Sequence, residues 1–377
     1  MQNRKNRTLA ILLIILLSLF ALHFTQFKYN WFKLKPLDGY YVDTEKNKFT
    51  WKGWFDGTYQ EVEDKYLTDH FGFRSFFIRI NHQWRFSLFN KAKTAWVTVG
   101  KENYLFEENY IKAWYGTDFI GVDSIEQRMY KFKHLQDTLE QLGKKLFIVL
   151  APGKGSYYPE YIPEQFHQEV GTTNISVYRE YIEKWNLNCI DFHRYFIDNK
   201  ETSPYPLYPQ YGIHWSVYGM CFVIDSIVRY VEKACNITMP HMFWNEIKMS
   251  QPDKFDNDIS KAMNLLFTPR SFEMAYPQVL IESDSGKTKP SLLVIGDSFY
   301  GNIYHLGYDQ QLFSNYHFWY YNKEIYPETA TNWTSIEGID LLQEILKYDV
   351  IFILSTDSNL PNLGWGFIEN YYHIFFE

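Results

Sequence analysis

The chain has 377 residues, 46% of them hydrophobic and 20% aromatic, and 37 basic against 44 acidic side chains give a formal net charge of −7. This length and composition exclude a disordered chain and a small disulfide-held scaffold, and suit one large domain or two smaller ones. Because no basic cluster follows the first seven residues, a nucleic-acid binder is also excluded. The three cysteines have no metal-finger spacing, so the sequence predicts no metal site.

The amino terminus predicts a membrane anchor. Leu9–Phe24 is an almost uninterrupted apolar run, and Arg4, Lys5 and Arg7 precede it. Basic residues stay on the cytoplasmic side, so the chain from Lys28 onward is expected outside the membrane. A cleaved signal peptide has the same charged start and apolar middle, but no small-residue cleavage site follows here. We therefore expect residues 1–27 to form a cytoplasmic tip and a single transmembrane helix.

Two regions are expected after the anchor, a stalk over residues 28–60 and an extracytoplasmic domain over residues 61–377. Hydrophobic periodicity and apolar runs predict helices, strands and one hairpin in the domain. In chain order they are a helical region at Glu61–Asn90, a hairpin at Val97–Phe106, a helix at Asp123–Gly143, a strand at Lys145–Ala151, a helix at Val177–Trp185, a strand at Cys189–Phe192, a helix at Trp215–Lys233, a strand at Leu292–Ile295, a helix at Asn302–Phe313, a strand at His317–Tyr321, a helix at Ile336–Leu346 and a strand at Val350–Leu354. This alternation predicts an α/β fold with a mostly parallel central sheet and helices on both faces. Ligands of such sheets bind at the carboxyl ends of the strands.

Ser298 is the first candidate for chemistry. It follows a buried strand directly in the sequence Gly296-Asp297-Ser298-Phe299, on the turn that leads into a helix. Its hydroxyl would project from the carboxyl edge of the sheet, where backbone N–H groups at the helix start can face an oxyanion. The alternative is that Ser298 only caps the helix and that Asp297 complements its dipole.

His214 is the candidate base, because a serine hydroxyl needs a general base to become a good nucleophile. It lies in an aromatic, Gly- and Pro-containing loop just before a helix. The alternative is a histidine that is only packed in the core.

Together these motifs resemble the SGNH hydrolase-like domain of the alginate O-acetyltransferase proteins of the AlgJ and AlgX type, a circularly permuted relative of GDSL esterases. The resembling segments run over most of the extracytoplasmic chain: Thr68–Arg74, Val97–Phe106, Leu150–Pro163, His214–Trp215, Gly296–Phe299 and Asp349–Leu354. Tyr104 stands one place earlier than the family spacing. The resemblance implies an SGNH-like three-layer fold and catalytic roles for Ser298 and His214.

One position departs from the family pattern. The family has an aspartate two residues before the histidine, and Gly212 stands there in this chain. Three outcomes are open. A backbone carbonyl orients His214 in a Ser–His dyad, an acid from elsewhere such as Asp191 reaches it, or the domain has lost catalysis and keeps only binding.

For the oxyanion we expect the backbone N–H of Phe299, and the family pattern adds a side-chain amide for which Asn359 is the candidate. Aromatic side chains near the expected site edge suit sugar rings, whose C–H faces stack on them. Our candidates for substrate contact are Trp215, Tyr211 and Tyr158, together with Arg270 for an acidic group.

The resulting expectation is a membrane-anchored O-acetyltransferase that acts on hydroxyls of an exported polysaccharide through an acyl-enzyme on Ser298. A carbohydrate esterase with the same site, or a non-catalytic polysaccharide-binding or assembly component, are the alternatives. No cofactor is expected. The resemblance implies a multispanning membrane-bound O-acyltransferase as partner and a place in the bacterial inner membrane with the domain in the periplasm.

Overall fold

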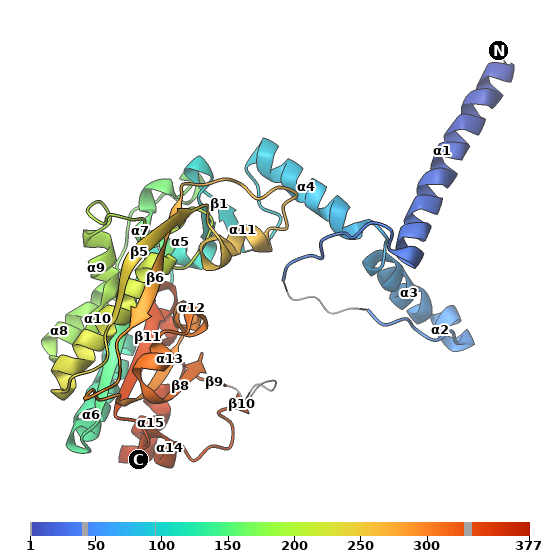
Figure 1. Ribbon diagram of the computed structural model, residues 1–377. Coiled ribbons are helices and arrows are strands. Elements are labelled where there is room, and N and C mark those ends of the chain that lie inside the picture. Colours follow the sequence, from blue (N-terminus) through green and yellow to red (C-terminus); the bar gives the residue numbers. More distant parts are fainter. Residues whose placement is uncertain (1, 40–43, 95, 328–333) are drawn as a thin grey trace. The chain divides into compact units, whose positions relative to one another are not determined.

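The computed structural model describes residues 2–39, 44–94, 96–327 and 334–377 (Figure 1). By their internal contacts these residues form two units. The first comprises residues 1–95 and 260–269, and the second comprises residues 96–259 and 270–377. This division falls later than the expected stalk boundary at residue 60, and part of that stalk, residues 40–43, lies outside the described residues.

The first unit is helical. It contains α1 (Gln2–Tyr29), α2 (Trp51–Asp56), α3 (Thr58–Asp69) and α4 (Arg74–Phe89). Within the described chain α1 is the one helix long and apolar enough to cross a membrane. The segment 260–269 joins this unit through side-chain hydrogen bonds, such as Arg79 Nη1 to the Leu265 carbonyl at 3.0 Å. The expected helical region at residues 61–90 is thus two helices, which the turn around Gly72 separates.

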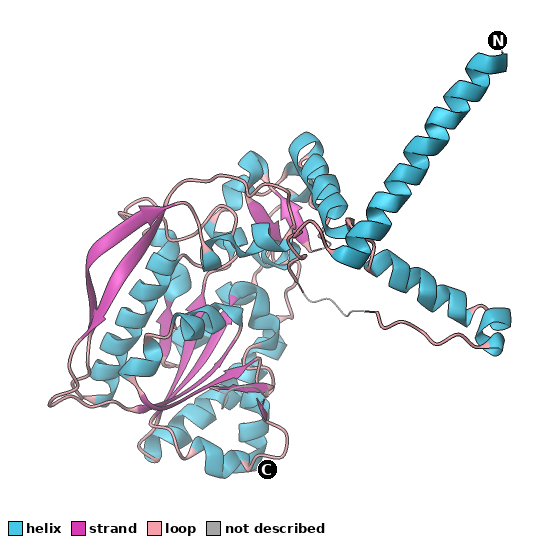
Figure 2. Cartoon of the chain, turned by 45° about the vertical axis from the view of Figure 1, so that its right-hand side comes forward, coloured by secondary structure: helices cyan, strands magenta, loops and turns pink. Residues whose placement is uncertain are grey.

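A seven-stranded sheet organises the second unit (Figure 2). Its strand order is β10 (Thr334–Ser335), β9 (Glu324–Tyr326), β8 (Ser314–Tyr320), β7 (Ser291–Gly296), β11 (Val350–Thr356), β3 (Lys145–Ala151) and β4 (Cys189–Asp191). The five strands from β8 to β4 are parallel to one another, while β9 pairs antiparallel with both β8 and β10. The carboxyl ends of β7, β11 and β3 therefore meet at the middle of one edge.

Two hairpins, ten α-helices, the start of α11 and short 3-10 helices complete the described part of this unit. The hairpins are β1 (Val97–Val99) with β2 (Leu105–Glu107), and β5 (Met242–Ser250) with β6 (Met274–Ile281). The helices are α5 (Glu108–Tyr115), α6 (Val122–Gln141), α7 (Lys154–Tyr157), α8 (Asn174–Lys184), α9 (Phe192–Asp198), α10 (Val217–Cys235), α11 (Asp258–Ala262), α12 (Ser298–Leu306), α13 (Asp309–Leu312), α14 (Leu341–Ile345) and α15 (Phe367–Phe376).

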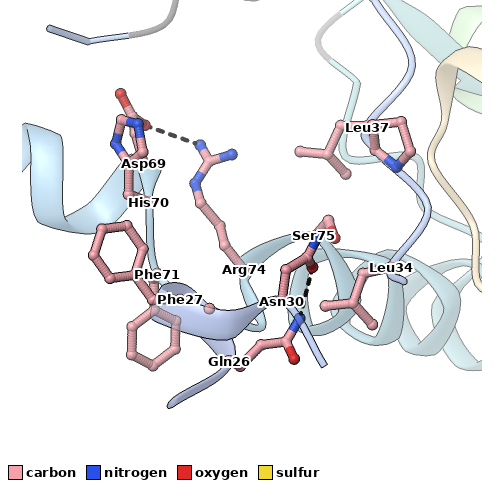
Figure 3. A pocket seen from close by; sticks show the side chains of 12 residues that line it. Gln26, Phe27, Asn30, Leu34, Leu37, Asp69, His70, Phe71, Arg74 and Ser75 are labelled. Carbon is pink, nitrogen blue, oxygen red and sulfur yellow. Dashed lines mark hydrogen bonds and ion pairs between the residues drawn. The ribbon is translucent and has the colours of Figure 1, made fainter. Parts of the chain in front are cut away.

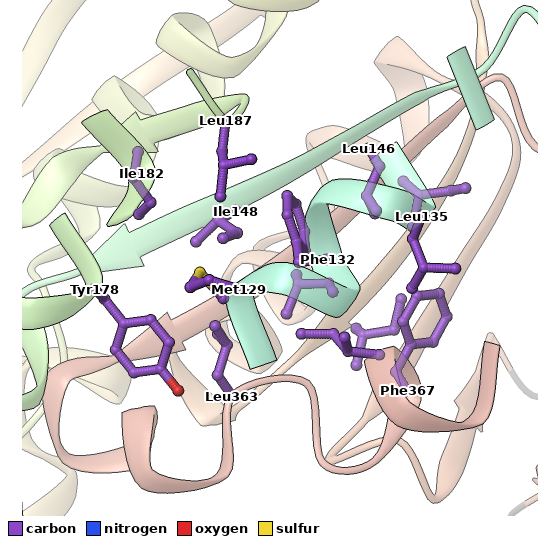
Figure 4. Packing of buried hydrophobic residues seen from close by; sticks show 14 of the residues in the cluster. Met129, Phe132, Leu135, Leu146, Ile148, Tyr178, Ile182, Leu187, Leu363 and Phe367 are labelled. Carbon is purple, nitrogen blue, oxygen red and sulfur yellow. The ribbon is translucent and has the colours of Figure 1, made fainter. Parts of the chain in front are cut away.

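Alternate residues of the strands face opposite layers of helices. On one face Leu146 and Ile148 of β3 pack with Met129 and Phe132 of α6, and α8 and α15 extend this core (Figure 4). On the other face Phe147 of β3 lies 5.5 Å from the Tyr230 ring of α10, and Phe318 of β8 lies 5.1 Å from the Tyr300 ring of α12. The predicted α/β fold, with a mostly parallel sheet covered on both faces, is confirmed.

Candidate active site

Ser298 is the first residue of α12, directly after the carboxyl end of β7. The carboxylate of Asp297 caps this helix by accepting the Phe299 amide at 3.0 Å. The same carboxylate accepts the backbone amide and the hydroxyl of Thr356, at 2.9 and 2.8 Å, from the end of the neighbouring strand β11. Asp297 therefore ties two central strand ends together and fixes where the Ser298 side chain begins.

His214 reaches Ser298 from the loop before α10. Its Nε2 lies 2.9 Å from Ser298 Oγ. The next residue fastens this loop to the serine helix, because the fully buried Trp215 donates its indole N–H to the Phe299 carbonyl at 3.2 Å. The nucleophile and base candidates, 84 residues apart in the chain, are thus held by adjoining hydrogen bonds.

Asp258, the first residue of α11, supplies the carboxylate on the far side of the imidazole. Its Oδ2 contacts Nδ1 of His214. Its Oδ1 accepts the backbone amides of Ile213 at 3.0 Å and Ile259 at 2.7 Å. Because one carboxylate binds both the ring and the backbone beside it, the ring orientation is fixed relative to the loop.

The structure corrects the suggestion that Asp191 orients His214. Asp191 instead binds Arg179 through both carboxylate oxygens, at 2.7 and 3.0 Å, and caps α9 by accepting the Arg194 amide at 2.8 Å. An aspartate at position 212 would also meet an obstacle. A Cβ on Gly212 would lie 2.8 Å from Pro209 Cγ and 3.1 Å from the Asp256 carbonyl oxygen.

Sequence reasoning missed Asp258. It lies 44 residues beyond His214, in a segment between β5 and β6 without strand or helix periodicity. No local pattern marks it as an acid for this histidine.

Several buried charges surround the imidazole. Burial lowers the pKa of His214, but the Asp258 carboxylate outweighs burial and, with Glu107 and Asp297, raises that pKa above its ordinary value of 6.5. Burial raises the pKa of Glu107 to about 7 and also raises that of Asp297. The site therefore favours a positive imidazole, the form that results when His214 accepts a proton.

Lys154 supports the loop that precedes α10 and carries His214. This residue follows β3, is fully buried, and donates from Nζ to the carbonyls of Gln210 at 2.7 Å and Gly212 at 2.6 Å. Burial lowers its pKa to about 7. A neutral amine still has two N–H donors, so both protonation states can serve the two carbonyls.

Both expected oxyanion donors are hydrogen-bonded to other groups of the protein in this structure. The Phe299 N–H donates to Asp297 Oδ1. The Asn359 amide donates to Asp297 Oδ2 at 2.9 Å and to Thr356 Oγ1 at 3.1 Å.

A hollow of about 160 Å³ opens beside Ser298. It is lined by Ser298, Gly301, Asn302, Tyr304, His305, Phe318, Tyr320 and Tyr326. The expected substrate contacts do not line it. Trp215, Tyr211 and Tyr158 are buried in the protein, whereas Arg270 is exposed. Those three aromatic residues thus pack around the histidine loop instead of facing this hollow.

A larger hollow of about 480 Å³ lies within the first unit (Figure 3). Two side-chain pairs cross its lining, Arg74 with Asp69 at 3.4 Å and Gln26 with Asn30 at 3.2 Å. The Ser–His pair is not part of that lining, so its size does not make it the catalytic candidate.

Residues 97–254 match the family model described as the SGNH hydrolase-like domain of the acetyltransferase AlgX. This segment includes His214 and ends before Asp258 and Ser298. No curated protein sequence matches the chain.

Three similar solved structures are the O-acetyltransferase domain of Pseudomonas putida AlgJ, Bacillus cereus PatB1 and Pseudomonas aeruginosa AlgX. AlgJ is 14% identical over 70% of this chain and 92% of that chain, with a TM-score of 0.46. PatB1 is 16% identical over 69% and 95%, with a TM-score of 0.44. AlgX is 12% identical over 73% and 67%, with a TM-score of 0.45. The family match over residues 97–254 confirms that this chain resembles the SGNH hydrolase-like domain of the acetyltransferase AlgX.

Proposed function

We propose that this chain is an O-acetyltransferase that modifies hydroxyls of an exported polysaccharide through a Ser298–His214–Asp258 triad. The observation that carries the proposal is the placement of one imidazole between a serine hydroxyl, at 2.9 Å, and a carboxylate. This is the arrangement by which a histidine removes a proton from a nucleophile while a carboxylate stabilises the resulting imidazolium.

The first half-reaction acetylates Ser298. Its Oγ attacks the carbonyl carbon of an acetyl ester, and its proton passes to Nε2 of His214. The leaving alcohol departs with that proton, and acetyl-Ser298 remains. In the second half-reaction a sugar hydroxyl attacks the acetyl carbon, His214 takes the hydroxyl proton, and Ser298 Oγ leaves and recovers it. If water replaces the sugar, the same site acts as an esterase.

Two further parts of the proposal concern the cellular setting. The apolar helix α1 anchors the chain in the bacterial inner membrane, with the second unit in the periplasm. A multispanning membrane-bound O-acyltransferase supplies the acetyl group across the membrane. Both follow from the resemblance to the AlgX and AlgJ type and from the basic residues before α1. No cofactor is required by this chemistry.

The direct test uses the full chain in detergent with p-nitrophenyl acetate. Ser298→Ala and His214→Ala are expected to lose release of nitrophenolate by about 10³-fold or more. Ser285→Ala, in an exposed turn, and His373→Ala, an exposed histidine that pairs with Glu377 at 2.7 Å, are the matched controls and should retain wild-type rates. Equal release by wild type and both site variants would overturn the triad. An inactive wild type that still binds polysaccharide would support the non-catalytic alternative.

A further inference from the structure

Helix α4 packs within the first unit through polar side chains. Arg79 is buried and donates to the carbonyls of Leu265 at 3.0 Å and Pro36 at 2.7 Å. On the next turn of the helix, His82 Nδ1 lies 2.7 Å from the Met263 carbonyl oxygen. Two segments that are distant in the sequence therefore cover this face of α4.

The opposite face of α4 carries an apolar stripe, which consists of Phe77, Trp84 and Leu88. These side chains are 49%, 60% and 65% exposed. Their i, i+7 and i+11 spacing places them on one face, and at 3.6 residues per turn that face lies roughly opposite Arg79 and His82. An amphipathic helix of a soluble protein has the reverse arrangement, with its apolar residues inward. The inverted polarity of α4 therefore marks the stripe as an interaction surface.

The start of α4 lies against the last turns of α1. The Phe71 ring, in the turn before α4, is 3.8 Å from the His23 ring. A Cβ on Gly72 would lie 2.5 Å from the His23 carbonyl oxygen and 2.8 Å from the Phe27 amide nitrogen, so the two backbones are in contact. His23 and Phe27 stand where the apolar run of α1 ends, which is where a spanning helix leaves the hydrocarbon. With α1 in the bilayer, α4 therefore begins at the membrane–water interface.

An apolar hollow of about 250 Å³ adjoins this contact. It lies between the last turns of α1, the end of α3 and the turn before α4, and its lining consists of Phe20, His23, Phe24, Phe27, Leu67, His70, Phe71 and Gly72. At the depth of the interface a hollow with this lining suits the acyl chain of a lipid.

The charge of this part of the chain also suits a lipid surface. Residues 70–100 contain five basic residues and no acidic one, although the whole chain has a net charge of −7. Arg85, Lys91 and Lys93 of this segment are exposed. Helices that lie in the bilayer interface combine such basic residues with Trp, Phe and Leu on the apolar face, because the basic groups attract anionic lipids while the apolar groups enter the acyl boundary.

We propose that α4 is a second membrane-contacting element, which lies in the extracytoplasmic interface of the bilayer with Phe77, Trp84 and Leu88 inserted among the lipids. The inference rests on the membrane anchor proposed above and extends it, since α1 crosses the bilayer and α4 lies along its surface. Two elements in contact with lipid restrict how the first unit is oriented at the membrane, whereas a single spanning helix would leave it free to swivel.

The first experiment identifies what covers the stripe. The full chain is reconstituted into vesicles of phosphatidylethanolamine and phosphatidylglycerol with the photoreactive residue p-benzoylphenylalanine in place of Phe77, Trp84 or Leu88. After irradiation the products are identified by intact mass. We expect lipid adducts at each of these positions, with a yield about ten-fold or more above that of the same residue in place of Ser285, in an exposed turn of the second unit. Placement at Leu16, within α1, is the positive control.

The masses of the products distinguish the other occupants. Crosslinks within one chain would mean that the protein itself covers the stripe, and crosslinked dimers would mean that a second copy does. Either result without lipid adducts would overturn the inference, as would the absence of any adduct at the three positions. If the Leu16 position also forms no lipid adduct, the membrane anchor itself fails. Adducts at Leu16 but not on α4 overturn only the role of α4.

The second experiment makes the stripe polar. Trp84→Gln with Leu88→Gln is combined with p-benzoylphenylalanine at position 77, and the lipid adduct there should fall about three-fold or more. The chain should remain in the carbonate-resistant membrane fraction, because α1 is unchanged. Leu142→Gln with Leu280→Gln, two exposed leucines of the second unit, is the matched control and should leave the adduct yield at position 77 unaltered. Equal yields in both double variants would contradict the role of the stripe, and thermal unfolding shows whether each variant has kept the native fold.

Discussion

The two carboxylate oxygens of Asp258 have different partners. Oδ2 contacts the imidazole of His214, and Oδ1 accepts the Ile213 amide of the same loop. A carboxylate in this position fixes the tautomer with its proton on Nδ1, which leaves Nε2 free to accept the Ser298 proton. Although Gly212 stands where the expected motif has an aspartate, an acid for this histidine is thus available from a segment 44 residues further along the chain.

We predict that Asp258→Asn lowers the rate of nitrophenolate release by about 10⁴-fold, because the amide no longer stabilises the imidazolium or its tautomer. Asp191→Asn is the matched control, since Asp191 binds Arg179 and not the imidazole. It should keep its turnover rate within about two-fold and lose about 1–3 kcal/mol of unfolding free energy with the lost ion pair and helix cap. Comparable rate losses in both variants would contradict the role of Asp258.

The pH dependence gives a second readout of the same residue. His214 must be neutral to accept a proton, so the rate should rise with pH through its pKa, which lies above 6.5 in the wild type. Without the Asp258 carboxylate the lowering effect of burial has less opposition. The midpoint of the rising limb should therefore move to lower pH in Asp258→Asn, although Glu107 and Asp297 still oppose that movement. An unchanged midpoint would mean that another group controls the profile.

At the scale of elements, the sequence predicted the parts whose signals are local. The strand β3, buried except for its first residue, was predicted with its correct bounds, and β7, β11, α6 and α10 were predicted within a few residues, because continuous apolar runs and a 3.6-residue period mark them directly. Ser216 caps α10 by accepting the Gly219 amide at 3.0 Å.

Elements whose stability comes from distant contacts were not predicted. The β5–β6 hairpin was missed because most of β5 is exposed or half-buried and carries no regular alternation. The helix expected at Ile336–Leu346 is wrong in extent, since α14 covers only Leu341–Ile345. Asp258 belongs with these cases, since its function follows from the fold and not from its neighbours in sequence.

The loop that carries His214 is an element without regular structure, and Lys154 holds it through two carbonyls. We predict that Lys154→Met lowers the unfolding free energy by about 1–3 kcal/mol, because buried carbonyls lose their donor. The rate should fall by about 10²-fold, since an imidazole displaced by 1 Å no longer reaches Ser298 well. Urea unfolding and kcat measurements check the two effects.

The control for this prediction is Lys144→Met. Lys144 also donates to two carbonyls, those of Leu346 at 2.7 Å and Tyr348 at 2.8 Å, but it is only half-buried and supports no site loop. Its variant should change the unfolding free energy by about 0.5 kcal/mol or less and leave kcat as in the wild type. If Lys154→Met lowers stability but not kcat, Lys154 supports the fold without positioning His214.

At the scale of the whole molecule, the chain combines a helix of exposed apolar residues with a unit that buries its own core. Leucines and isoleucines of α1 are about half exposed or more, whereas the leucines and isoleucines of the central strands β3, β7 and β11 are almost fully buried. Exposed apolar surface of this length requires another apolar environment, and a bilayer provides one. A proposed acetyl donor that is itself in the membrane would then lie close to the tethered domain.

Anchoring predicts that charges in α1 release the chain from membranes. Leu13→Lys with Leu16→Lys places two charges near the middle of the span, each of which costs about 2.5–3.5 kcal/mol on insertion. We expect this double variant to move from the carbonate-resistant membrane fraction to the supernatant. Leu142→Lys with Leu280→Lys changes two exposed leucines outside α1 and should remain in the membrane fraction. Intact mass measurement of the membrane-bound wild type should include residues 1–27, whereas a cleaved product would favour a signal peptide and contradict the anchor.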